Sequence, residues 1–259
     1  MSKILALASV VITELYRRKD FYVLFVLTAA LTLVAGSVNF FQDDKIVRII
    51  KDLCLLLIWI SALIVAIATA ARQIPAERES RTIFPLLAKP VSRAQVIAGK
   101  FLGCWLATGA ALVVFYGFFA IITGSREHLW PWAVYLEAVW MQWFMLAIVI
   151  GMVLLGSIYF AAPSSTTTIT FIVSVGILLL GSHLNTVALQ QPEPMSSILS
   201  FVYYLMPHLE WYDLRDFLVY DMGRVPVRFV ALATLYAAAW TGIFLLLAWF
   251  GFRRKNLTT

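Results

Sequence analysis

Six long apolar stretches constrain the fold of this chain more than any other feature of its sequence. Each is close to, or above, the roughly 20 mostly apolar residues that a helix needs to cross about 30 Å of hydrocarbon. Lipid offers no hydrogen bonds to an exposed backbone, so stretches of this kind must form helices. We expect an all-α polytopic membrane protein whose six transmembrane spans are Phe21–Phe41, Leu53–Ala71, Phe101–Thr123, Trp132–Phe160, Thr168–Leu189 and Val227–Phe252.

The composition leaves no room for a separate soluble domain. Hydrophobic residues make up 62% of the 259 residues and charged residues only 13%, against about 45–50% and about 25% in soluble proteins. No polar stretch is long enough to enclose its own core, so we predict a single transmembrane domain over residues 1–259. Cys54 and Cys104 lie in apolar runs and are expected to be small buried residues without a disulfide.

The placement of charge predicts the orientation in the membrane. If both termini are cytoplasmic, the inner segments are strongly basic and the outer segments slightly acidic, as the positive-inside bias requires. We therefore expect both termini on the cytoplasmic side of the membrane. The net charge of +6 follows from this asymmetry and does not indicate nucleic acid as a partner.

Three segments outside the spans are expected to form shorter helices. Residues 1–20 place apolar side chains on one helical face, typical of an interfacial helix that either anchors the chain or has a functional role. Residues 190–226 mix apolar, aromatic and charged residues, which suits short outer helices packed against the last two spans. Residues 72–100 form the longest inner loop, whereas the inner loop Ala161–Thr167 is uncharged, and its Ser and Thr residues are expected to cap the fifth span.

The loop of residues 72–100 is a dense island of charge. Pro75, Pro85 and Pro90 divide it, so Glu77–Leu87 is expected to form one or two short helices on the membrane surface. Ser92 is placed to cap a helix that continues into the third span.

The sequence carries no recognisable catalytic site. It has no phosphate-binding loop of the G-x-x-x-x-G-K-[ST] type, and its three histidines lack metal-ligand spacing, so no cofactor or metal is expected on this chain. Only Asp52 and Glu137 bring carboxylates near the spans, and both are expected at the outer interface. Charge-free span centres argue against an ion-coupled transporter, so energy would have to come from a partner that binds the charged loop.

The same loop carries a series of short motifs. They are Glu77 and Glu79, Arg81-Thr82, Leu86-Leu87, Pro90-Val91-Ser92-Arg93 and Gly99-Lys100. With these motifs the chain resembles the membrane subunits of bacterial ABC exporters of the type-2 permease family. Ser80-Arg81 stands where that family often has glycine, which affects only the local turn. The resemblance implies a half-transporter of the bacterial inner membrane that forms a homodimer and pairs with two ATPase subunits, which carry the ATP and Mg²⁺ and dock against a coupling helix.

The resemblance also assigns roles to two groups of residues. Charged members of the first group would pair with the ATPase, and its apolar members would fill a pocket on it. The second group would form an external gate over a substrate path between two copies, lined mainly by spans one, two and five. The coupling group is Glu77, Arg78, Glu79, Arg81, Thr82, Phe84, Leu86, Leu87, Pro90, Ser92 and Arg93, and the outer gate is Tyr203, Tyr204, Pro207, Trp211, Asp213 and Arg215.

Two other functions fit the same sequence. One is a stand-alone secondary transporter or channel, and the other is a membrane assembly or scaffold protein that binds partners through the same loop. The apolar walls suit lipid-like cargo, but the sequence does not disclose the substrate, and the direction of transport follows only from the resemblance.

Overall fold

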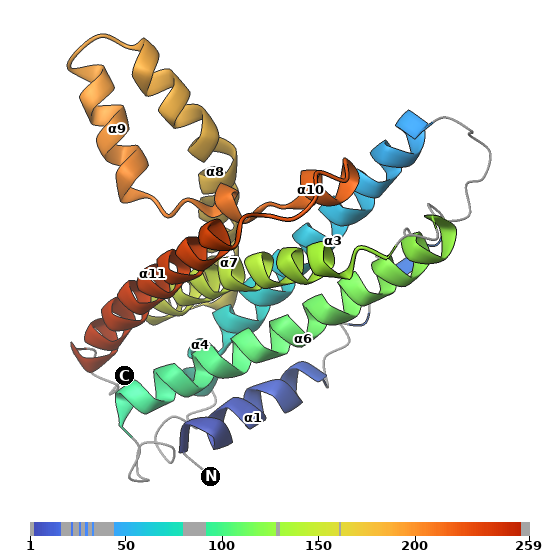
Figure 1. The fold of residues 1–259 in the computed structure, drawn as a ribbon. Helices are drawn as coiled ribbons and strands as arrows, with labels where there is room; N and C mark the ends of the chain where they lie inside the picture. Colours follow the sequence, from blue (N-terminus) through green and yellow to red (C-terminus); the bar gives the residue numbers. More distant parts are fainter. Residues whose placement is uncertain are drawn as a thin grey trace.

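The computed structural model describes residues 3–16, 22, 26, 29–30, 33, 44–79, 92–127, 130–160 and 162–254. Every regular element among these residues is a helix (Figure 1), so the all-α prediction is confirmed for the described part of the chain. The five long helices are α3 (Asp44–Arg72), α6 (Arg93–Glu127), α7 (Trp132–Tyr159), α8 (Pro163–Gln190) and α11 (Val227–Arg254).

All five long helices are long and apolar enough to cross a membrane, and they correspond to the second to sixth predicted spans. The predicted span Phe21–Phe41 falls mostly outside the described residues. Several helices begin before their apolar runs do, α6 at Arg93 and α8 at Pro163, because polar residues continue the backbone hydrogen bonding beyond the hydrocarbon. The chain is a multi-pass membrane protein.

Helix α7 lies at the centre of the bundle. It packs against α3, α6, α8 and α11, and Met145, Ile150 and Leu154 on it are completely buried. In the most apolar parts of α3 and α7, 67% of residues are buried, against 28% in α8 and 17% in α11. Large side chains such as Leu179 and Leu235 are exposed on these two peripheral helices, so their outer faces are available to lipid or to another chain.

Two tryptophans join α6 to α7. The indole Nε1 of Trp105 donates to the carbonyl oxygen of Trp143 at 3.0 Å, and Nε1 of Trp143 donates back to the carbonyl of Trp105 at 2.8 Å. The rings stack with centroids 4.4 Å apart. The missing side chain at Gly109 leaves room for the Trp143 indole, which an added Cβ atom would overlap. Further along α7, Trp140 donates to the Thr234 hydroxyl of α11 at 3.0 Å.

The N-terminal segment forms helix α1 (Lys3–Tyr16), which packs along α6. Two glycines of α6 allow the close approach: a Cβ atom at Gly99 would lie 2.7 Å from the Cβ of Leu7, and one at Gly103 would lie 2.7 Å from the Cβ of Val11. The helix predicted within residues 1–20 is therefore present and is seated on α6 (Figure 1). Its position in the membrane interface stays a prediction.

The predicted outer helices are α9 (Met195–Leu205), the 3-10 turn η1 (Leu209–Tyr212) and α10 (Arg215–Val219). Helix α9 packs on α8 and has no buried residue, and the two project together from the bundle in Figure 1. The turn η1 packs against α8, as predicted, and the Tyr212 hydroxyl donates to the Ala233 carbonyl of α11 at 2.7 Å. Helix α10 differs from the prediction: it packs on α3 and α7, because its apolar Leu218 and Val219 complete the core there.

Candidate functional site

The C-terminal end of α3, which the charge pattern predicts to lie on the inner side of the membrane, continues into the start of the charged loop. After Arg72, residues Gln73 and Ile74 form a turn, and Pro75 begins the short helix α4 (Pro75–Glu79). Proline suits the first position of a helix because its missing N–H has no intrahelical partner there. A short helix therefore occupies the first part of the predicted coupling element, and the prediction for residues 80–91 lies outside the described residues.

Lys100 ties this turn to α6. Its side chain is only 5% exposed, and its Nζ donates to the Gln73 carbonyl at 2.7 Å, to Gln73 Oε1 at 3.3 Å and to Glu77 Oε1 at 2.7 Å. A buried ammonium group is costly unless its three donors are satisfied, and here each has an acceptor. The positive charge also lies at the C-terminal end of α3, where a helix favours cations. Lys100 thus joins α3, α4 and α6 at one point, which we call the inner joint.

A second contact fixes the first turn of α6. Ser92 Oγ accepts the Gln95 N–H at 3.2 Å, and Gln95 Oε1 accepts the Ser92 N–H at 3.0 Å. This reciprocal capping box confirms the predicted cap. Arg93 donates from Nη1 to the carbonyl oxygens of Phe252 and Arg253 at 2.6 and 3.0 Å. A residue at the start of α6 thus caps the last carbonyl groups of α11.

A small apolar cluster lies beside the two polar contacts. Ile74, Ile97, Ile158, Ala248 and Phe252 are all buried together and come from the turn after α3 and from α6, α7 and α11. The cluster therefore packs the turn between α3 and α4 against the ends of α6, α7 and α11.

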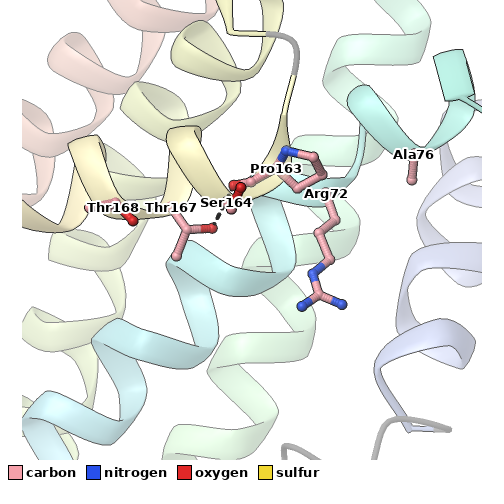
Figure 2. A pocket seen from close by; sticks show the side chains of 6 residues that line it. All are labelled: Arg72, Ala76, Pro163, Ser164, Thr167 and Thr168. Carbon is pink, nitrogen blue, oxygen red and sulfur yellow. Dashed lines mark hydrogen bonds between the residues drawn. The ribbon is translucent and has the colours of Figure 1, made fainter.

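An open pocket of about 600 Å³ lies between the inner ends of α3, α4 and α8. Figure 2 shows its six lining residues, Arg72, Ala76, Pro163, Ser164, Thr167 and Thr168.

The helix cap predicted from the Ser and Thr residues at this end of α8 is wrong. Helix α8 begins at Pro163, its N-cap residue Ala162 provides no side-chain bond, and the hydroxyls of Thr166 and Thr167 bond back to the carbonyls of Ala162 and Pro163. The proline at the first helical position was the signal for this earlier start.

The predicted coupling residues are only partly brought together. Glu77, Ser92 and Arg93 make the contacts above, and Arg78 and Glu79 belong to α4. The remaining six, Arg81, Thr82, Phe84, Leu86, Leu87 and Pro90, lie outside the described residues. Sequence reasoning missed Gln73 and used Lys100 only as part of the Gly99-Lys100 motif of the resemblance. The helix crossing that brings residues 73, 77 and 100 together leaves no local pattern.

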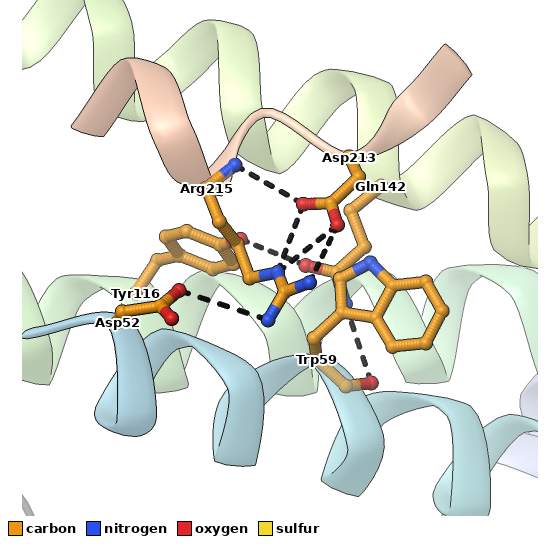
Figure 3. Close-up of polar contacts among 6 residues, drawn as sticks. All are labelled: Asp52, Trp59, Tyr116, Gln142, Asp213 and Arg215. Atoms are coloured by element: carbon orange, nitrogen blue, oxygen red, sulfur yellow. Dashed lines mark hydrogen bonds and ion pairs between the residues drawn. The ribbon is translucent and has the colours of Figure 1, made fainter. Parts of the chain in front are cut away.

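The predicted gate residues separate into two groups. In the first, Arg215 forms a fork with Asp213: Nε donates to Oδ1 at 2.9 Å and Nη2 to Oδ2 at 2.7 Å. Figure 3 shows the guanidinium group between Asp213 and Asp52 of α3, whose Oδ1 lies 3.8 Å from Nη1. The bonds to Asp213 raise the pKa of Arg215 above its ordinary value, so the group is charged at every working pH. This outer clamp holds the segment before α10 against α3.

A buried polar link lies beneath the outer clamp (Figure 3). The Tyr116 hydroxyl of α6 donates to Gln142 Oε1 of α7 at 2.8 Å, and Gln142 Nε2 lies 3.5 Å from the Trp59 carbonyl oxygen of α3. Tyr116 and Gln142 are almost completely buried. Three helices therefore meet at one hydrogen-bonded layer.

In the second group, aromatic residues surround His208. The imidazole stacks on Tyr203 at 4.3 Å between centroids and lies 4.8 Å from the ring of Trp211. Burial lowers the pKa of His208, an effect that the nearby Glu210 carboxylate opposes. Tyr204 is 75% exposed, and its ring packs edge-on against Tyr203 with the centroids 5.5 Å apart. Pro207 is buried in the turn before η1, next to His208. No sequence pattern indicated His208 as the centre of this cluster.

The two carboxylates predicted near the outer interface both have partners. Asp52 faces Arg215, as described, and Glu137 accepts the Arg224 Nε–H at 3.0 Å and the Val225 N–H at 3.1 Å. The Glu137 side chain is 13% exposed. Through these two hydrogen bonds, Glu137 holds the segment before α11 against α7.

Comparison with known proteins identifies a family for this chain. The family model described as ABC-2 family transporter protein matches residues 12–257. No curated protein matches the chain. The family match covers nearly the whole chain, including the inner joint and the outer clamp. The chain therefore belongs to the ABC-2 transporter family.

Proposed function

We propose that this chain is the permease subunit of an ATP-driven ABC exporter, in which two copies pair with two separate ATPase subunits. Membrane subunits of the ABC-2 family generally pair with ATPase subunits, and this chain lacks a phosphate-binding loop of its own. The described centres of α3, α6, α7, α8 and α11 carry no Asp, Glu, Lys or Arg, which argues against an ion-coupled secondary transporter. Bacterial inner-membrane location and cytoplasmic termini are part of the same proposal.

The inner joint is the observation that carries this proposal. Lys100 binds Glu77 of α4 on one side and Gln73, in the turn after α3, on the other, so a push on the loop of residues 72–100 would move both spans together. Glu77 Oε1 accepts from Lys100 and its Oε2 is buried, so this carboxylate belongs to the inside of the joint.

Helix α3 connects the inner joint to the outer clamp and would carry movement from one to the other. Its inner end is held by Lys100 through Gln73, and its outer part carries Asp52, which faces Arg215 of the outer clamp. ATP binding would thus reach the external gate through the tilt of one helix. The gate assignment is part of the proposal and comprises Tyr203, Tyr204, Pro207, Trp211, Asp213 and Arg215.

The first experiment tests for the ATPase. The chain is expressed together with proteins encoded beside it, and the purified complex is examined for a stoichiometric nucleotide-binding subunit with ATPase activity. We expect one such subunit per chain. Recovery of a functional transporter without any nucleotide-binding subunit, or substrate-dependent proton or sodium flux in liposomes containing this chain alone, would contradict the proposal.

The second experiment tests the coupling path in that complex. A spin label at Tyr204→Cys, on the exposed face of α9, reports the distance between the two copies by electron double resonance. We expect ATP with vanadate to change this distance, and Lys100→Met to abolish the change while the ATPase subunit remains bound. Arg228→Gln, at an exposed residue of the outer end of α11, is the matched control. An unchanged response in Lys100→Met would refute the role of the inner joint.

A further inference from the structure

We propose that the pocket between α3, α4 and α8 binds an anionic phospholipid, with the lipid phosphate at Arg72, Ser164 and Thr168 and the acyl chains along the α8 face beyond them. This site is separate from the inner joint and does not depend on the proposed function. Figure 2 shows the three polar residues on the walls contributed by α3 and α8.

The polar part of the site consists of hydrogen-bond donors. Arg72, Ser164 and Thr168 are exposed, and their side chains form no hydrogen bond or ion pair within the described part of the chain. The hydroxyl of Thr167, by contrast, is already bonded to the Pro163 carbonyl at 2.9 Å. A guanidinium group is the side chain best suited to a phosphate, since its planar donors match two oxygens at once. The two hydroxyls add neutral donors beside it.

The apolar part of the site continues along the same helix. Ser164, Thr168 and Ile172 follow one another at intervals of four residues, so they lie on one face of α8. Ile172 is 63% exposed, and Ile169 and Val173 beside it are also exposed. From Ser164 to Ile172 the side chains on this face change from hydroxyl-bearing to aliphatic, over eight residues or about 12 Å at 1.5 Å per residue.

This order decides the class of ligand. A phospholipid has the same sequence of groups, an anionic phosphate followed by hydrocarbon, and the pocket volume of about 600 Å³ suits its polar head. An acidic side chain of a docked protein would use Arg72 but would leave the apolar face beyond Thr168 without a partner. Basic pockets between transmembrane helices are known sites for anionic lipid head groups. The charge of Arg72, together with the aliphatic face, therefore favours a lipid over an acidic peptide.

Native mass spectrometry tests this site directly. The full chain is placed in nanodiscs of phosphatidylcholine with one quarter phosphatidylglycerol, released, and examined for retained lipid. We expect phosphatidylglycerol to be retained in preference to phosphatidylcholine. Loss of the charged hydrogen bonds in Arg72→Gln should weaken retention about tenfold, whereas Arg72→Lys should keep most of it. Arg228→Gln, which removes an exposed arginine at the outer end of α11, should retain lipid like the wild type.

A second pair of variants separates the two parts of the site. Ser164→Ala combined with Thr168→Ala should lower retention of phosphatidylglycerol, and Ile172→Asn should lower retention of both lipids. Equal phosphatidylglycerol retention by wild type and Arg72→Gln would overturn the proposal. Displacement of the lipid by millimolar inorganic phosphate would show that the pocket selects the free anion, and Arg72→Glu losing an ATPase subunit with unchanged lipid retention would show a protein dock. Either result would also overturn it.

Discussion

Replacing Gly103 by alanine tests whether α1 is an integral part of the bundle. A Cβ atom at this position would lie 2.7 Å from the Cβ of Val11, 2.9 Å from the Ala8 carbonyl oxygen and 3.1 Å from the Ala8 Cα. Carbon atoms in contact prefer about 3.5–4.0 Å. These neighbours are backbone and Cβ atoms, which cannot rotate away, so α1 would have to retreat by roughly 1 Å along its contact with α6.

The expected magnitude follows from two opposing effects. Overpacking of a tight contact costs about 1–3 kcal/mol, while alanine is better than glycine within a helix by about 0.5–1 kcal/mol. We therefore expect Gly103→Ala to lower the free energy of unfolding by about 1–2 kcal/mol. Gly117 of the same helix has nothing within 4 Å of its added Cβ, so Gly117→Ala should leave stability unchanged or raise it by up to about 1 kcal/mol.

The assay is unfolding by SDS in mixed micelles, followed by tryptophan fluorescence. Val11→Gly removes one of the clashing atoms, so the double variant Val11→Gly with Gly103→Ala should lose less stability than the two single losses added together. Equal unfolding curves for Gly103→Ala and Gly117→Ala would refute the close packing of α1 on α6. Strict additivity in the double variant would refute the assignment of the clash to Val11.

Three further predictions concern the helix ends and the outer segment. Arg93→Gln should lower the free energy of unfolding by about 1.5–3 kcal/mol, since charged hydrogen bonds to the end of α11 are lost, and Arg93→Lys should recover part of it in the same SDS titration. Asp213→Asn should lower the thermal midpoint of unfolding more than Asp52→Asn. Asp213 accepts two short hydrogen bonds from Arg215, whereas the half-exposed Asp52 makes one contact of 3.8 Å with the same guanidinium group. The pKa of His208 in the folded protein lies below its ordinary value of 6.5. The contribution of His208 to stability is therefore complete above pH 6.5 and is lost as the pH falls through the folded pKa. In unfolding curves measured between pH 5 and 7.5, His208→Phe should lose less stability on acidification than the wild type.

The sequence was a good guide wherever a feature depends on neighbours along the chain. Apolar length predicted five of the long helices, and Ser92 was recognisable as a cap because Gln95 follows at capping-box spacing. The close packing of α1 on α6 could also have been predicted, since Gly99 and Gly103 stand four residues apart in a membrane helix.

The remaining features depend on how helices cross. Lys100 looks like an ordinary basic residue at the end of a span, and only the approach of α3 to α6 gives it Gln73 and Glu77 as partners. In the same way, α10 follows a mixed polar and aromatic segment, and its position on α3 and α7 is set by a gap in the core that no local pattern describes.

The reciprocal bonds between Trp105 and Trp143 limit where this protein can change shape. Each indole spans the seam between α6 and α7 in a region with little water to replace a broken bond, and Trp140 attaches α11 to the same body. These three helices therefore form a fixed frame. Among the described helices, we therefore expect the movements of transport at α8 or α3, and a search for moving parts should start at these two helices.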